Sequence, residues 1–95
     1  MKEGKTKSGF AYRFDEKAAN DMLFFETLSE IEGEGTRPLR KIAAIGKAAE
    51  MLLGKEQKAA LYAHISAQNE GRVPPGVLEA ELGEIMGGSP ETKNC

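Results

Sequence analysis

The sequence is poor in the residues that build large cores. Of its 95 residues, none is tryptophan, four are phenylalanine and two are tyrosine. A chain of this length buries only about 60% of the surface that its unfolded form exposes. The core must therefore come mainly from leucine, isoleucine, methionine and alanine, a composition that favours helices over a sheet sandwich. We expect a small helical protein without a large internal active site.

Cysteine and long apolar runs are also scarce. The single cysteine is Cys95, so no disulfide can form within the chain, and nothing in the sequence indicates an oxidising compartment. The basic start MKEGKTKSG leads into no apolar run of signal-peptide length, and nowhere do about 18 apolar residues follow one another. These absences predict a cytoplasmic protein with no membrane partner.

Neither sign of charge is in large excess. The chain carries 13 basic and 15 acidic side chains, which leaves a formal net charge of -2. Nonspecific binding to nucleic acid or to an anionic membrane depends on an excess of positive charge. The charge balance therefore disfavours both kinds of partner.

Composition along the chain predicts one domain with two tails. Residues 1–9 and 87–95 offer little to bury, so we expect flexible tails there and a folded domain at residues 10–86. Phe10, Tyr12 and Phe14 alternate with Ala11 and Arg13, which indicates an extended arm with one aromatic face. Because one strand cannot make a sheet, the arm must lie on helices or pair with another chain.

Four short helices are expected after the arm, which gives an all-α bundle. Capping side chains, prolines and glycines set their limits. The residues that begin or end these helices are Asp15, Ile31, Pro38, Gly54, Gly71 and Pro75. The break at Gly54 is short, so the second and third helices should be neighbours.

Apolar spacing predicts which face of each helix is buried. The inward residues expected in the four helices are, in chain order, Ala18, Met22, Phe24, Phe25, Leu28 and Ile31; Leu39, Ile42, Gly46, Ala49 and Leu53; Leu61, Tyr62 and Ile65; and Leu78, Leu82 and Ile85. Leu23 falls outside the first of these faces. Ala44, Ala48 and Met51 form a second apolar face on their helix, which suits a helix-in-groove contact or self-association, although alanine needs no partner.

The stretch SAQNEGRVPPGV has the glycine of a calcium loop but not its acids. Ser66 and Val77 stand where the first and last carboxylates should be, so we expect no calcium site. His64 lies away from the buried stripe of its helix, and one histidine with one terminal cysteine makes neither a metal site nor a nucleophile-base pair. We expect a protein that is not an enzyme and takes no cofactor.

A second interpretation comes from MLLGKEQKAAL. A turn at Gly54 is followed by Lys55, Gln57 and Lys58 at the start of a helix, as in a helix-turn-helix that enters a DNA groove. A DNA-binding regulator is therefore an alternative function, although the negative net charge weakens the electrostatic attraction that dominates such binding.

Three stretches together cover most of residues 10–86: FAYRFDEKAANDMLFFETLSEI, MLLGKEQKAALYAHI and EGRVPPGVLEAELGEIM. Their order of aromatic arm, acidic-aromatic helix, LLG-x-EQ junction and GRVP-like turn resembles the small tail assembly chaperones of long-tailed bacteriophages and prophages. The resemblance implies an all-helical protein of the host bacterial cytoplasm that binds the tape measure protein during tail morphogenesis and is absent from the mature virion. It brings no catalytic, metal or cofactor residues.

Three side chains are the partner-binding residues that we expect. Leu23 stands outside the core face, Phe24 lies at the edge of that face, and Met51 belongs to a second apolar face. The alternatives to a tail assembly chaperone are the DNA-binding regulator and a structural head-tail connector protein.

Overall fold

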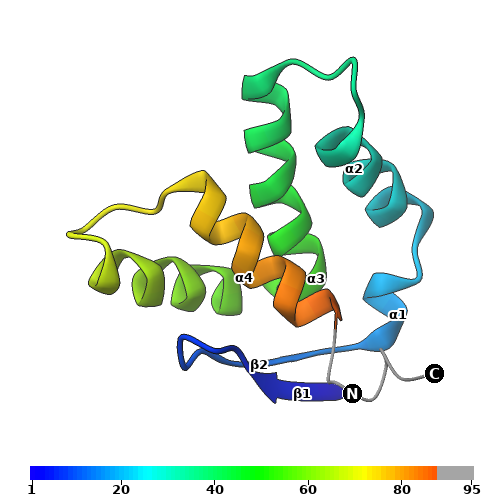
Figure 1. Cartoon of the computed structure of the whole chain (residues 1–95). Coiled ribbons are helices and arrows are strands. Elements are labelled where there is room, and N and C mark those ends of the chain that lie inside the picture. Colours follow the sequence, from blue (N-terminus) through cyan, green and yellow to red (C-terminus); the bar gives the residue numbers. More distant parts are fainter. Residues whose placement is uncertain (88–95) are drawn as a thin grey trace.

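A β-hairpin begins the chain and helices make up the rest (Figure 1). The structure is a computed structural model that describes residues 1–87. Its elements are β1 (Lys2–Lys5), β2 (Ala11–Phe14), α1 (Glu16–Ala19), α2 (Met22–Glu32), α3 (Pro38–Gln68) and α4 (Pro75–Gly87). The predicted helical character is confirmed, but the fold is not purely all-α because β1 and β2 form a two-stranded antiparallel sheet.

The structure contradicts the flexible tail that we expected at residues 1–9. Lys2 pairs with Phe14 and Lys5 pairs with Ala11, so the predicted arm finds its partner strand within its own chain. The turn between them is closed by Thr6, whose carbonyl accepts the Gly9 N–H at 2.9 Å. The strand KEGK carries no apolar pattern, which is why its sequence reads as a tail. Beyond Gly87, the tail expected at residues 87–95 lies outside the described residues.

The first predicted helix is broken into two. The Asp15 carboxylate caps α1 by accepting the Lys17 N–H at 2.9 Å, and the Asp21 carboxylate caps α2 by accepting the Leu23 N–H at 2.8 Å. Asp21 has an extended backbone, so the chain turns there instead of continuing as a helix. A single helix through this stretch was therefore a wrong expectation.

The buried side of α2 is narrower than the predicted core face. Phe24 and Thr27 are buried, and Leu28 and Ile31 are half-buried against the core. Met22 and Phe25, both expected inward, are exposed. Their exposure is a second correction to the helix that was expected to run from Asp15.

Gly54 divides α3 into two helical halves, as predicted. Its backbone angles, φ 85° and ψ 164°, lie outside the helical region. Figure 1 shows the first half standing upright and the second half turning away towards the left of the view. These angles belong to a region of conformational space that is essentially restricted to glycine.

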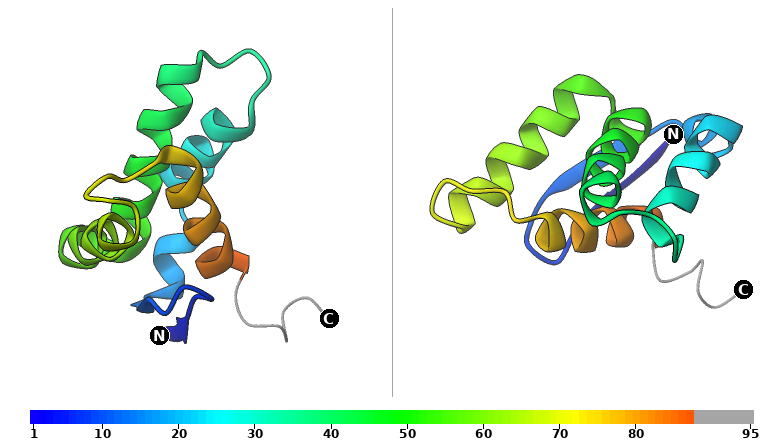
Figure 2. Two further views of the ribbon diagram at one scale, coloured as in Figure 1. Left: turned by 60° about the vertical axis from the view of Figure 1, so that its left-hand side comes forward. Right: turned by 90° about the horizontal axis from the view of Figure 1, so that it is seen from above.

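The core is built around the first half of α3. Both α2 and α4 pack on α3, and the hairpin lies across the lower end of the helices in Figure 1 and in the left view of Figure 2. The largest fully buried side chains are Phe24, Leu61, Ile65, Leu82 and Ile85. Within residues 1–87, no helix combines the length and apolar character needed to cross a membrane.

The buried face of α3 agrees with the prediction in the second half and only partly in the first, where Ala49 and Leu53 are buried as expected but Ile42 is exposed. In the second half, Leu61 and Ile65 are buried as expected. In the first half, Ala44 and Ala48 are buried although they were placed on an outer face, whereas Leu39 is 80% exposed. Because neighbours lie on more than one side of this half, its small alanines allow close packing.

The left-handed backbone at Gly54 predicts a specific sensitivity to mutation. Replacing Gly54 with alanine should cost about 1–3 kcal/mol in the free energy of unfolding, because the new Cβ is strained at this φ even though no atom lies within 4 Å of it. Urea denaturation followed by circular dichroism measures this free energy.

Gly83 is the matched control for this substitution. It lies in α4 with helical geometry and no atom within 4 Å of an added Cβ. Gly83→Ala should therefore stabilise the protein by about 0.5–1 kcal/mol. Equal effects of the two substitutions would contradict a strained turn at Gly54.

Candidate functional site

Exposed apolar side chains gather at the start of α2. Met22, Leu23 and Phe25 are all exposed and follow directly after the Asp21 cap; we name these three residues the α2 patch. Leu23 is 64% exposed, as its position outside the predicted core face required. A single exposed leucine is ordinary, but three large apolar side chains within one turn indicate a surface that another molecule can cover.

Phe24 does not belong to this surface. It is only 2% exposed and is part of the buried core cluster. A partner could reach its ring only by opening the core, so the prediction that Phe24 binds a partner is wrong. Its burial agrees with its place among the inward residues that apolar spacing predicts.

Met51 connects the α2 patch to a second surface. It is half-buried and packs against the core, and its sulfur lies 3.5 Å from the Thr27 hydroxyl oxygen. The same hydroxyl donates to the Leu23 carbonyl at 2.8 Å. Since Leu23 and Thr27 are one helical turn apart, they share a ridge of α2 that runs beside Met51.

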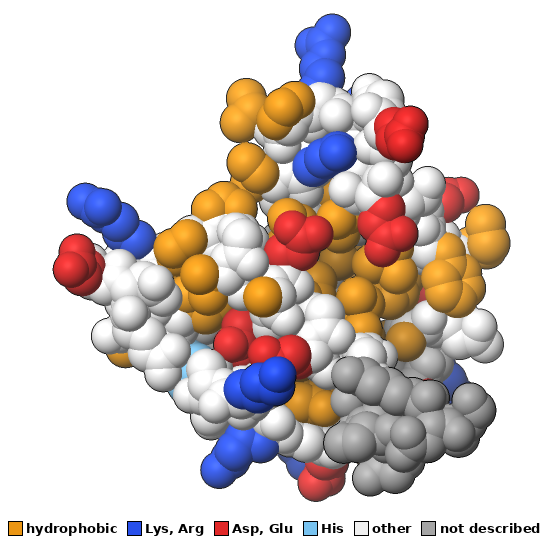
Figure 3. Space-filling view, in the orientation of Figure 1, with side chains coloured by type: hydrophobic (Ala, Val, Ile, Leu, Met, Phe, Trp, Pro, Cys, Tyr) orange, Lys and Arg blue, Asp and Glu red, His pale blue; other side chains and the backbone are white. Residues whose placement is uncertain are grey.

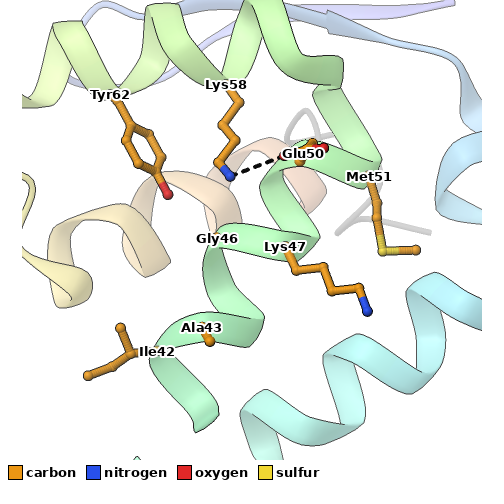
Figure 4. A pocket seen from close by; sticks show the side chains of 8 residues that line it. All are labelled: Ile42, Ala43, Gly46, Lys47, Glu50, Met51, Lys58 and Tyr62. Carbon is orange, nitrogen blue, oxygen red and sulfur yellow. Dashed lines mark hydrogen bonds and ion pairs between the residues drawn. The ribbon is translucent and has the colours of Figure 1, made fainter. Parts of the chain in front are cut away.

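The second surface is a groove of about 550 Å³ on the inside of the bend in α3 (Figure 4). We name it the elbow groove. Side chains from both halves of α3 line it: Ile42, Ala43, Gly46, Lys47, Glu50, Met51, Lys58 and Tyr62. Gly46 makes room for Tyr62, because a Cβ at Gly46 would lie 3.0 Å from the Tyr62 hydroxyl.

Of the two lysines that line the elbow groove, one is paired with an acid and the other is not. Lys58 pairs with Glu50 at 3.3 Å and also lies 5.5 Å from the centre of the Tyr62 ring. Lys47 is exposed and forms no ion pair with any other of residues 1–87. The groove therefore combines apolar and charged lining residues and carries one uncompensated positive charge.

Another apolar area lies on the opposite face. In Figure 3, hydrophobic side chains gather between the positions of α2 and α4. Leu28 and Ile31 of α2 and Val77 of α4 are half-buried and pack against the core. In Figure 4, α4 lies behind α3, whereas Figure 1 has it in front, so the elbow groove and this area face in different directions.

A polar cluster fixes the hairpin to the helices. The Ser8 hydroxyl donates to Glu81 Oε2 at 2.7 Å and lies 3.0 Å from His64 Nε2. Glu81 is 6% exposed, and its Oε1 has no hydrogen-bond partner among the described residues. His64, expected at the surface, is half-buried, with the Phe10 ring centre 5.7 Å from its own.

This cluster is not arranged for nucleophilic catalysis. A hydroxyl has one hydrogen, and Ser8 gives it to Glu81, so His64 Nε2 must donate to Ser8 and cannot accept its proton. A general base that activates serine would need the opposite arrangement. The sequence could not have suggested the cluster, since Ser8, His64 and Glu81 lie in three separate elements.

The helix-turn-helix interpretation is weakened by two contacts. The Gln57 side chain accepts the Arg13 N–H at 2.9 Å and also donates to the Arg13 carbonyl, so it is engaged with β2. Lys58 is paired with Glu50. Of the three side chains expected to reach DNA, only Lys55 has no such contact among the described residues. Residues 1–87 contain no group of three His, Cys, Asp or Glu that could hold a metal ion.

The hydroxyl of Ser8 should matter for stability. Ser8→Ala would leave both oxygens of the buried Glu81 carboxylate without a protein partner, which should cost about 1–3 kcal/mol in the free energy of unfolding. Thermal melting followed by circular dichroism measures the change.

Ser66 provides the control for the loss of a hydroxyl. Its hydroxyl donates only to the Ala63 carbonyl on the helix surface, at 3.1 Å. Ser66→Ala should therefore change stability by no more than about 0.5 kcal/mol. If Ser8→Ala were equally harmless, the cluster would not be what holds the hairpin.

Comparisons with known proteins identify no relative. The chain matches no family model, and neither curated proteins nor solved structures give a significant match. Its function therefore has to be inferred from the surfaces and contacts described above.

Proposed function

We propose that this protein is a tail assembly chaperone that binds an amphipathic helix of the tape measure protein and acts by binding, not by catalysis. The observation that carries this proposal is the α2 patch, where Met22, Leu23 and Phe25 remain exposed on a short chain that can spare few apolar residues. The resemblance of residues 10–86 to such chaperones supports the same function.

The shape of the surface favours a helical partner. The ridge of Leu23 and Thr27 runs to Met51, which lines the elbow groove, so the α2 patch and the groove are neighbours. A helix that presents apolar side chains every three or four residues can contact both. A tape measure protein would present such helices before its tail tube exists.

The energetics of the patch suit temporary binding. Burial of one large apolar side chain contributes about 1.5–3 kcal/mol. Association costs about 4–15 kcal/mol in lost freedom of motion, so a few such side chains give a contact that can form and later be released. A chaperone absent from the finished tail needs a complex of this kind.

The competing DNA-binding function has less support. Gln57 is held by the backbone of Arg13 and Lys58 is held by Glu50, so two of the three candidate side chains are already engaged. The formal net charge of -2 provides no general attraction to the phosphate backbone. We therefore favour a protein partner over nucleic acid.

Co-expression with the tape measure protein that the proposal requires provides the test. The unmodified protein should keep that partner soluble, and Leu23→Asp should abolish the effect because a carboxylate would be desolvated without a partner in the contact. The isolated variant should fold normally, since Leu23 is 64% exposed and an acid in the first turn of a helix is favourable.

Met86→Asp is the control, because Met86 is an exposed apolar residue of α4 outside both surfaces. This variant should solubilise the partner as the unmodified protein does. Full activity of Leu23→Asp would exclude the α2 patch. Failure of the unmodified protein, together with tight and salt-sensitive binding to duplex DNA, would favour the regulator.

A further inference from the structure

We infer that the elbow groove of one molecule receives the α2 patch of a second copy, so that the free protein is a twofold dimer whose two exposed apolar surfaces cover each other. This inference goes beyond the proposed function and does not depend on it. It rests on the apolar stripe of α3, on two complementary charges, and on the nearness of the two surfaces.

The apolar stripe of α3 is only partly used by the core. Leu39, Ile42, Ala43 and Gly46 recur at spacings of three and four residues and therefore share one face of the helix. Leu39 is 80% exposed, and Ile42 and Ala43 are also exposed. Figure 1 shows the first turns of α3 standing clear of α4. Among residues 1–87, the first part of this stripe is thus left exposed, and only its end at Gly46 approaches Tyr62.

The α2 patch has the chemistry that this stripe requires. It offers Met22, Leu23 and Phe25 on a helix, and Glu26 lies among them, exposed and without an ion pair to any other of residues 1–87. The groove offers Lys47, which is also exposed and without such a pair. A largely apolar patch with one free acid therefore suits a partly apolar groove with one free base.

The charges of whole elements agree with this pairing. The residues of α2 include no base, and its acids Glu26 and Glu32 have no ion pair with any other of residues 1–87, whereas Glu30 pairs with Arg40 at 3.8 Å. Beside Lys47, the first half of α3 also carries Lys41. The start of α3 also carries the positive end of its helix dipole. Two copies of α2 would repel each other, so contact between α2 and the groove is favoured over contact between like patches.

The positions of the two surfaces allow a closed dimer. Thr27 on the ridge of Leu23 contacts Met51 of the groove, so patch and groove adjoin on one molecule. When two complementary surfaces adjoin, a twofold axis beside them brings each patch into the other groove. The same contact is then made twice, which closes the assembly instead of extending it into a chain.

A charge exchange tests this inference on the purified protein. Sedimentation equilibrium between about 1 µM and 1 mM should detect a dimer of the unmodified chain. Lys47→Glu and Glu26→Lys should each weaken it by at least ~10-fold in Kd, because each places like charges in contact. The double variant Lys47→Glu/Glu26→Lys should restore the affinity to within about 3-fold of the unmodified protein.

Lys55→Glu is the control, since it makes the same change of charge at an exposed position of α3 outside the groove and should leave the dimer intact. Circular dichroism and melting should confirm that every variant folds. A monomer throughout the concentration range would overturn the inference. So would a dimer that the single substitutions do not weaken, or one that the double variant does not restore. Because the co-expression test does not require a dimer, either idea can fail without the other.

Discussion

The backbone of Gly54 is the constraint on which the remaining structure depends. A straight helix through Pro38–Gln68 would carry Leu61 and Ile65 away from the residues that they contact in the core. The bend returns the second half of α3 towards α4 and the hairpin, where His64 and Glu81 hold Ser8. The same bend creates the elbow groove, because Tyr62 and Lys58 face Gly46 and Glu50 across it. The bend at Gly54 therefore produces both the packing of the core and the elbow groove.

Signals that act over a few residues were readable from the sequence. Pro38 and Pro75 begin helices, Gly54 interrupts one, and Leu78, Leu82 and Ile85 form a buried face, all as their spacing predicts. Asp21 was the local signal overlooked: a second capping aspartate six residues after Asp15 allows a second helix start. With a cap at Asp21, Met22 lies in the first turn of a new helix, where apolar spacing alone does not decide whether its side chain is buried.

Other features depend on contacts that no local pattern carries. The strand at Lys2–Lys5 is stabilised by pairing with β2, and its own residues show no strand preference. The burial of Ala44 and Ala48 depends on which helices flank α3, since periodicity identifies a stripe but not the number of neighbours. The Ser8, His64 and Glu81 cluster joins residues up to 73 positions apart. Apolar spacing therefore predicts the exposure of Leu23 and the burial of Phe24, but it does not predict that Met51 packs against the core or that Phe24 is closed to a partner.

The exposed apolar residues have a physical consequence for a chain this small. Leu39, Ile42, Met22, Leu23 and Phe25 are all outside the core, although a domain of this length has little apolar surface to spare. Contact with another chain would bury these side chains and so add to the stability of the folded form by mass action. The dimer proposed above would supply this stabilisation from a second copy of the chain, and the proposed partner helix would supply it by covering the same side chains. The two proposals therefore make alternative uses of the same surfaces.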